Sequence, residues 1–381
     1  MRRNDVTEDK TVVEAGSVTM DKGMPKGRNQ GIEALRIVSM FLIVVMHTLK
    51  QGGVLVAANG STAHFYLAWF LEVIAFCAVD CYALISGYVG VQARFRWSRP
   101  VKLWLQVVFY TVLITLFFQI CYPSGMNYKY WLKAVFPVLS REYWYISCYF
   151  GLMIFMPVLN EGIKALPVKQ LRNMVIAAVV LFCVLPVLLQ GYPFNFNPEA
   201  DYFGLLNGYS VLWLMVLYLI GAYIRVSDRV RQLKDRKIVA GALAAVLLTW
   251  GAFVFLPEYT LKRFGEVRYS AILLNYTSPT VLLVAVAFLL LFERKQSWNR
   301  VVDKVIGVMA PATLGVYLIH THPLIWDSFM KDYAVSFAEG TVLGMVGKVL
   351  AASAGIYLVC TCVDLVRGWI FKSVVRIMNR E

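Results

Sequence analysis

Charged side chains are scarce in this sequence: Asp, Glu, Lys and Arg make up 16% of 381 residues, against 59% hydrophobic residues and a mean hydropathy of +0.62. This composition excludes a soluble domain of this length and predicts a membrane protein. The sequence also lacks a P-loop, a GxSxG nucleophile elbow, an HExxH zinc motif and any nucleic-acid-binding motif. The seven cysteines form no CxxC pair and lie in or beside apolar segments, so we interpret them as small hydrophobic residues. We therefore expect no metal site and no nucleic-acid partner.

Ten mostly apolar stretches are long enough to cross a hydrocarbon core of roughly 30 Å as helices. We therefore predict an all-α, polytopic membrane bundle of about ten transmembrane helices over residues 31–365. Residues 1–30 are polar and show no apolar region typical of a cleaved signal peptide, so we predict a disordered cytoplasmic tail. Residues 366–381 are predicted to be a basic, amphipathic cytoplasmic tail. The predicted spans are residues 32–50, 66–91, 103–121, 143–159, 173–190, 209–224, 238–255, 271–292, 306–325 and 342–364.

The basic residues indicate how the bundle is oriented. Most of the 37 Lys and Arg residues fall in the amino-terminal tail, the carboxyl-terminal tail and alternate loops, such as "RFRWSRPVK". Short cytoplasmic loops are enriched in Lys and Arg, so both termini are predicted to be cytoplasmic. The formal net charge of +14 is then explained by topology and by attraction to anionic membrane lipids, without a nucleic acid.

The first predicted helix, "RIVSMFLIVVMH", begins with Arg36 and ends with His47. Eleven residues at about 100° each bring both side chains to one face, about 16 Å apart along the axis. One face of this helix is therefore polar at two depths. Alternatively, Arg36 extends to the inner headgroups and His47 marks the outer end of the helix.

The second predicted span carries two acids, Glu72 and Asp80, in an otherwise apolar stretch. Ionisable groups at such depth are rare and usually pair. Counting rise along antiparallel helices puts Glu72 near the height of His47 and Asp80 near that of Arg36, which predicts the pairs His47–Glu72 and Arg36–Asp80. Alternatively, Asp80 is a structural acid held by backbone groups and Ser86.

A late span, "PATLGVYLIHTHP", brings a second imidazole to the height of His47. His320 lies near that height, with Tyr317 about one turn below. We expect His320, rather than His322, to face the interior of the bundle. In the alternative interpretation both histidines mark the membrane interface, because Pro323 ends the helix.

The first inner loop, "RFRWSRPVK", gathers four basic residues around one tryptophan. Guanidinium groups bind phosphates through paired hydrogen bonds, so this loop could hold a phosphate-rich ligand at the cytoplasmic side. A positive-inside anchor needs only the charge and remains the alternative.

From about Gly31 to Leu365 the sequence resembles the acyltransferase 3 family of membrane-bound acyltransferases. The family's arginine, ten residues and histidine on the first helix correspond to Arg36 and His47. The segments "CYALISGYV", "YWYISCYFGLMIFMPVL" and "LGVYLIHTHPLI" resemble three further family patches in the same order. The sequence departs from the family at "CYALISG", where many members carry two phenylalanines. Arg96 and Arg99 match an arginine pair found on the first inner loop of some members.

The resemblance implies transfer of an acyl group, typically acetyl from acetyl-CoA, to a hydroxyl of a cell-surface carbohydrate in the bacterial plasma membrane. Acyl-CoA would be a donor substrate, with no cofactor bound permanently. His47 would act as general base or as acyl carrier. The implied catalytic residues are His47, Arg36, Glu72, Asp80 and His320; coenzyme A would contact Arg36, Arg96 and Arg99; the acceptor site would include Ser86, Trp144, Tyr145 and Tyr317.

Two other classes of function are compatible with the residues alone. A proton-coupled transporter or flippase for a lipid-linked sugar would use the same buried acids, arginine and histidine as a pathway. An inert membrane sensor is the other class, but it would not require buried acids, arginine and histidine. Consumption of a thioester distinguishes the enzyme from both.

Overall fold

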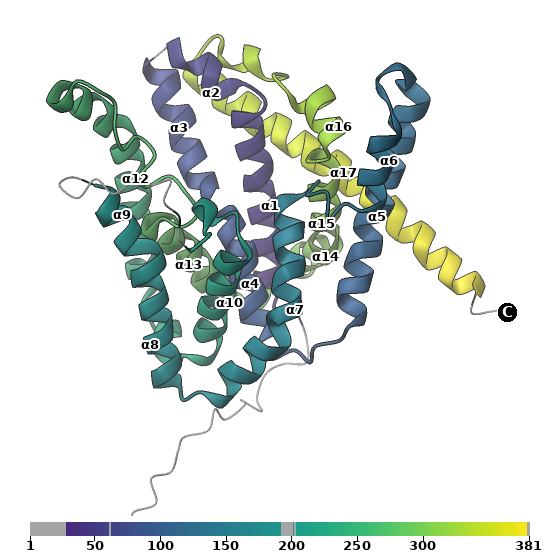
Figure 1. The fold of residues 1–381 in the computed structure, drawn as a ribbon, viewed down its shortest axis with the longest axis horizontal. Coiled ribbons are helices and arrows are strands. Elements are labelled where there is room, and N and C mark those ends of the chain that lie inside the picture. The colour runs from purple at the N-terminus through teal and green to yellow at the C-terminus, as the bar shows by residue number, and fades with distance from the viewer. Residues whose placement is uncertain (1–27, 61, 192–200, 202, 379–381) are drawn as a thin grey trace, which may run out of the picture.

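The computed structural model describes residues 28–60, 62–191, 201 and 203–378. These residues form helices and connecting turns and contain no strand, which confirms the all-α prediction (Figure 1). The helices are α1 (Gln30–Lys50), α2 (Val54–Ala57), α3 (Thr62–Phe76), α4 (Ala78–Gly90), α5 (Ser98–Cys121), α6 (Tyr128–Val135), α7 (Trp144–Ala165), α8 (Val168–Val179), α9 (Leu185–Gln190), α10 (Val211–Val226), α11 (Asp228–Arg231), α12 (Asp235–Phe264), α13 (Pro279–Glu293), α14 (Arg300–Met309), α15 (Thr313–His320), α16 (Pro323–Ile325) and α17 (Val342–Met378).

Each predicted span contains a helix or helices in series, but in the span predicted over residues 271–292 the helix begins only at Pro279. Eight helical segments of the described chain are long and apolar enough to cross a membrane, and α10 and α13 are shorter apolar helices. The length and composition of these helices support the prediction of a multi-pass membrane protein. The number of ten crossings and the cytoplasmic location of both termini stay predictions. The predicted tail over residues 1–30 lies almost wholly outside the described residues. At the other end, α17 continues without a break past the predicted boundary at 365 to Met378.

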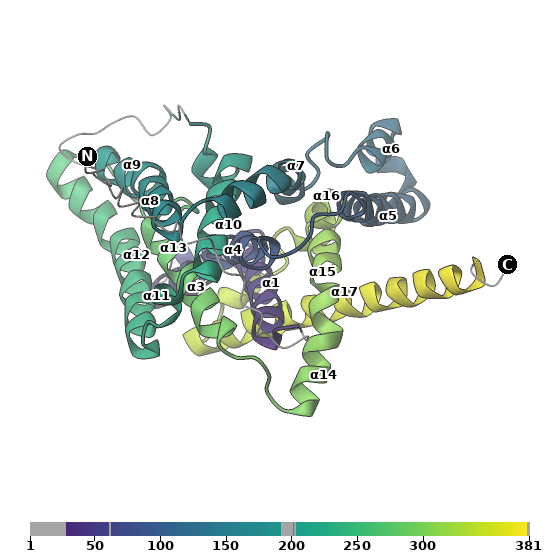
Figure 2. The same ribbon diagram turned by 90° about the horizontal axis from the view of Figure 1, so that it is seen from below.

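Helix α1 lies inside the bundle (Figures 1 and 2). It contacts α3, α4, α13, α14, α15 and α17. Of the residues in the most apolar stretch of α1, 67% are buried. The corresponding share is 22% for α12 and 11% for the segment α8–α9, and both lie at the periphery. Most of α1 therefore faces other helices, where its buried polar residues need partners.

Both ends of α1 are fixed by specific contacts. At its start the Asn29 side chain accepts a hydrogen bond from the Ile32 amide (3.2 Å) and donates to the Glu293 carbonyl (2.7 Å). A side chain at Gly31 would begin 1.8 Å from the Phe292 carbonyl oxygen, so glycine allows α1 to approach the end of α13. At its far end Gly53 has φ +86°, a left-handed conformation that glycine adopts readily, and the chain turns into α2.

Glycines also bring α4 and α10 into backbone contact. A Cβ atom on Gly87 would lie 2.0 Å from the Tyr218 carbonyl oxygen, and one on Gly221 would lie 2.1 Å from that of Leu84. Small residues at such crossings allow membrane helices to pack closely. This crossing fixes α4, which carries Asp80 and Tyr82.

Candidate active site

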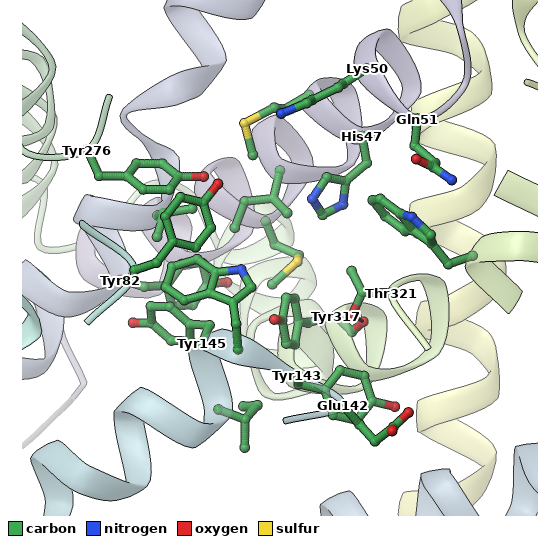
Figure 3. A pocket seen from close by; sticks show the side chains of 18 of the residues that line it. His47, Lys50, Gln51, Tyr82, Glu142, Tyr143, Tyr145, Tyr276, Tyr317 and Thr321 are labelled. Atoms are coloured by element: carbon green, nitrogen blue, oxygen red, sulfur yellow. Dashed lines mark hydrogen bonds between the residues drawn. The ribbon is translucent and has the colours of Figure 1, made fainter. Parts of the chain in front are cut away.

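A cavity of about 480 Å³ lies at the carboxyl-terminal end of α1 (Figure 3). Its volume is in the range of small-molecule sites, and most of its wall is aromatic or apolar. In Figure 3 the His47 ring projects into the cavity, with Tyr317 and Thr321 on one side and Tyr82, Tyr145 and Tyr276 on the other. The lining residues are Met40, Ile43, Met46, His47, Lys50, Gln51, Glu72, Phe76, Val79, Tyr82, Glu142, Tyr143, Trp144, Tyr145, Ile146, Tyr209, Tyr276, Thr313, Leu314, Tyr317, Thr321, Pro323, Trp326 and Asp327.

The two predicted inward-facing histidines are in contact. His47 Nδ1 lies 2.9 Å from His320 Nε2, although the residues are 273 positions apart in the chain. His320 is 1% exposed, and its Nδ1 lies 2.6 Å from the carbonyl oxygen of Val316, one turn earlier in α15. The contact confirms the prediction from the sequence that these two side chains lie at the same height in the bundle.

These contacts determine where the protons lie when both rings are neutral. Because a carbonyl oxygen can only accept, His320 donates through Nδ1, which leaves its Nε2 as an acceptor. His47 must then donate through Nδ1 to His320. The lone pair of His47 is consequently on Nε2, the atom that is not used in this pair. His47 is therefore presented as a base, with its tautomer set by a second imidazole.

The predicted pair of His47 with Glu72 is wrong, because His320 occupies the Nδ1 atom of His47. Glu72 is 2% exposed and lines the same cavity. Among the described residues its Oε2 atom has no hydrogen-bond partner, and neither does the hydroxyl of Tyr145. Buried polar atoms without partners are uncommon, so both groups are available to a ligand.

The predicted ion pair of Arg36 with Asp80 is also wrong. Arg36 Nη1 lies 3.3 Å from the Glu33 carboxylate, one turn earlier on the same helix. Asp80 is fully buried and accepts a hydrogen bond from Trp213 Nε1 at 3.2 Å, on α10. Its other oxygen, Oδ2, has no hydrogen-bond partner among the described residues, and Ser86 donates to the Tyr82 carbonyl instead.

The cavity ends one turn short of Arg36. On α1 it extends from Gln51 to Met40, and Tyr82, which lines it, donates a hydrogen bond to the Arg36 carbonyl (2.7 Å). Arg36 itself does not line the cavity. The polar face predicted for α1 is thus divided between His47 in the cavity and Arg36 beyond its inner end.

The remaining predicted residues fall into two groups. Trp144, Tyr145 and Tyr317 line the cavity. Ser86, Arg96 and Arg99 do not: Ser86 donates to the Tyr82 carbonyl (2.9 Å), and the two arginines are exposed.

The loop between α4 and α5, which carries Arg96, lies at the end of the bundle opposite His47, and Arg99 follows it in the first turn of α5. Gln92, in this loop, accepts a hydrogen bond from Arg225 (3.0 Å) at the last turn of α10. Tyr88, just before the loop, donates to Glu293 (2.7 Å), next to the start of α1. The basic loop and the histidine pair therefore mark the two ends of α1.

Sequence reasoning missed several side chains of the cavity, among them Tyr276, Gln51 and Trp326. The ring centroid of Trp326 lies 4.7 Å from that of His47, at an interplanar angle of 86°. Its position three residues after Pro323 was the available signal, because proline commonly begins a new helix. The described residues hold no group of three metal-ligating side chains.

A protein-family model described as an acyltransferase domain matches residues 29–364. No match was found among curated proteins or among solved structures. The matched region covers nearly the whole chain, including the histidine pair, the cavity and the basic loop. The chain therefore belongs to the acyltransferase 3 family and is a membrane acyltransferase.

Proposed function

We propose that this acyltransferase moves an acetyl group from cytoplasmic acetyl-CoA to a hydroxyl of a cell-surface or lipid-linked carbohydrate, in a bacterial plasma membrane. The observation that carries the proposal is the bond from the buried His320 to His47, which lines the cavity. It supplies a neutral imidazole whose free nitrogen can take a proton from an attacking hydroxyl.

In the proposed reaction His47 Nε2 removes the proton from the acceptor hydroxyl as the oxygen attacks the thioester carbonyl. A C–O bond forms, the C–S bond breaks, and the proton passes to the sulfur of coenzyme A. General base catalysis of this kind contributes about 10²- to 10⁴-fold. A two-step route, with the acetyl group carried on His47, would use the same nitrogen. Both routes require His47.

The donor is proposed to bind with its phosphates at the basic loop. Arg96 and Arg99 are exposed at the end of the bundle opposite His47, and their guanidinium groups suit phosphate oxygens. Arg36 and His47 are separated by about 16 Å of helix rise. The long pantetheine arm of coenzyme A would extend along α1, so the thioester reaches the cavity while the phosphates stay outside the bundle.

The acceptor is proposed to bind against the cavity wall formed by Trp144, Tyr145 and Tyr276. Their aromatic faces offer the flat apolar surface on which a sugar ring can lie. The unpartnered Oε2 atom of Glu72 and the unpartnered hydroxyl of Tyr145 can bind sugar hydroxyl groups there.

The test uses purified protein in lipid nanodiscs with radiolabelled acetyl-CoA and membranes that supply glycan acceptors. Release of coenzyme A and label in the glycan are both measured. We expect His47→Ala and His47→Gln to lower both by about 100-fold or more. The matched control is His322→Asn: His322 does not line the cavity but accepts from the Leu324 amide at 3.2 Å, a capping contact that asparagine can make.

Equal coenzyme A release by His47→Ala and by unmutated protein would refute the proposed role of His47. Movement of a lipid-linked sugar without consumption of acetyl-CoA would favour a transporter or flippase instead.

A further inference from the structure

The connection between α15 and α17 covers the histidine pair. We call residues His322–Ala334 the roof segment. Its backbone is bonded to the carboxyl-terminal end of α1: the Asp332 amide donates to the Gln51 carbonyl (2.9 Å), and the Ala334 amide donates to the Gly52 carbonyl (2.9 Å). A Cβ atom on Gly52 would lie 3.1 Å from that of Ala334, so the two backbones are in close contact.

Side chains fasten the roof segment as well. The Tyr333 hydroxyl lies 2.8 Å from the Thr48 hydroxyl, which accepts a hydrogen bond from Ser353 of α17 at 3.0 Å. Burial raises the pKa of Tyr333, so this group stays a neutral phenol at neutral pH. The roof segment is therefore attached to both α1 and α17, and its position over His47 is defined.

Trp326 is the roof residue that contacts the base. Its indole meets the His47 imidazole edge to face, with ring centroids 4.7 Å apart, while His320 packs against His47 at 5.1 Å. Trp326 begins a π-helical turn, Trp326–Met330, in which the Lys331 amide donates to the Trp326 carbonyl (3.0 Å). Such wide turns are rare and are frequent at functional sites.

A base that activates a sugar hydroxyl can also activate water. Water attack on the thioester would give acetic acid and coenzyme A: a C–O bond forms, the C–S bond breaks, and the water proton passes to sulfur. This reaction consumes acetyl-CoA without product on the acceptor. Water is abundant at a membrane surface, so the site needs a group that excludes water near Nε2.

We propose that Trp326 favours a sugar hydroxyl over water as the acyl acceptor, because its indole fills the space beside His47 that a water molecule would otherwise occupy. The sugar hydroxyl then approaches from the part of the cavity where Tyr82, Tyr145 and Tyr276 lie (Figure 3). This inference rests on the proposed function, since it assumes thioester chemistry at His47. It adds a specificity-determining residue to that site.

The experiment measures coenzyme A release from acetyl-CoA with no acceptor present. Trp326→Ala is expected to raise this release by about tenfold, while lowering the fraction of acetyl groups found on glycan when acceptor membranes are added. Trp326→Phe keeps an aromatic ring against His47 and should stay near the unmutated value. Phe329→Ala alters the same π-helical turn, but Phe329 is 50% exposed and does not line the cavity, so this control should also be unchanged.

Adding His47→Ala to Trp326→Ala should abolish the extra release, because the leak depends on the same base. Trp326→Leu, checked for folding by its thermal midpoint, replaces Trp326→Ala if that variant does not fold. A folded variant that still transfers acetyl but leaks no more than unmutated protein would overturn the inference. Absence of His47-dependent release by the unmutated protein when acceptor membranes are present would instead overturn the proposed function.

Discussion

His320 reaches no reacting atom directly in the proposed mechanism but fixes the base that does. Its Nε2 accepts the Nδ1 proton of His47, and the carbonyl of Val316 holds its own Nδ1 proton. When His47 becomes protonated in the reaction, this acceptor stabilises the imidazolium. His320 is therefore a positioning residue, comparable in role to the carboxylate of a hydrolase triad.

Removing this acceptor should affect turnover more than binding. We expect His320→Phe to lower kcat by about 100-fold, since the base loses its preferred tautomer, while KM for acetyl-CoA changes little. His320→Gln offers a carbonyl oxygen to His47 and should retain more of the kcat. Steady-state coenzyme A release gives both constants. Equal kcat values for the two variants would contradict a hydrogen-bonding role.

At the residue scale, the sequence predicted the height of a side chain along the bundle axis but not which neighbouring side chain it contacts. A rise of 1.5 Å per residue correctly brought His47 and His320 to one level. The same counting matched Glu72 to the height of His47 and Asp80 to that of Arg36, but equal height did not make either pair neighbours. Asp80 contacts Trp213 on α10, a helix far along the chain, and Glu33 was overlooked as a partner of Arg36 one turn away.

At the scale of helices, the crossing of α4 and α10 determines where Asp80 and Tyr82 lie. Gly87→Ala would introduce a Cβ atom 2.0 Å from the Tyr218 carbonyl oxygen, which is backbone and cannot simply turn aside. We expect a destabilisation of about 1–3 kcal/mol or more, from overpacking. The thermal midpoint of the purified protein in detergent should fall accordingly.

Gly241→Ala is the matched control for this substitution. Gly241 lies inside α12, and a Cβ atom there would meet nothing within 4 Å. Alanine is the better helix former by about 1 kcal/mol, so this variant should be neutral or stabilising. A similar loss of stability in both variants would mean that the α4–α10 contact is not the cause.

The apolar spans were predictable because membrane helices must be long and continuous in hydropathy. The roof segment was not predictable: the bonds from Asp332 and Ala334 to the end of α1 join positions about 280 residues apart and leave no periodic pattern. The short helix α6, Tyr128–Val135, was likewise missed, because eight residues give too little periodicity.

At the scale of the whole molecule, the two ends of α1 differ in chemistry. The basic loop with Arg96 and Arg99 lies at one end, and the cavity with His47 lies at the other. If the positive-inside rule sets the orientation, the donor phosphates meet the cytoplasm and the cavity lies toward the outer leaflet. An acyl group would then cross the membrane within the bundle, which makes orientation the decisive property of the proposed mechanism.

Single cysteines at the two ends test this orientation. In a protein with the exposed Cys121 and Cys362 and the half-buried Cys148 replaced by serine, we place Lys129→Cys on α6 or Arg229→Cys on α11, both at exposed positions. A membrane-impermeant maleimide should label Lys129→Cys in intact cells, and Arg229→Cys only after permeabilisation, because Arg229 belongs to the basic end, which is predicted to be cytoplasmic. The reverse pattern would place the basic loop outside, where no acetyl-CoA is available, and would contradict a cytoplasmic donor.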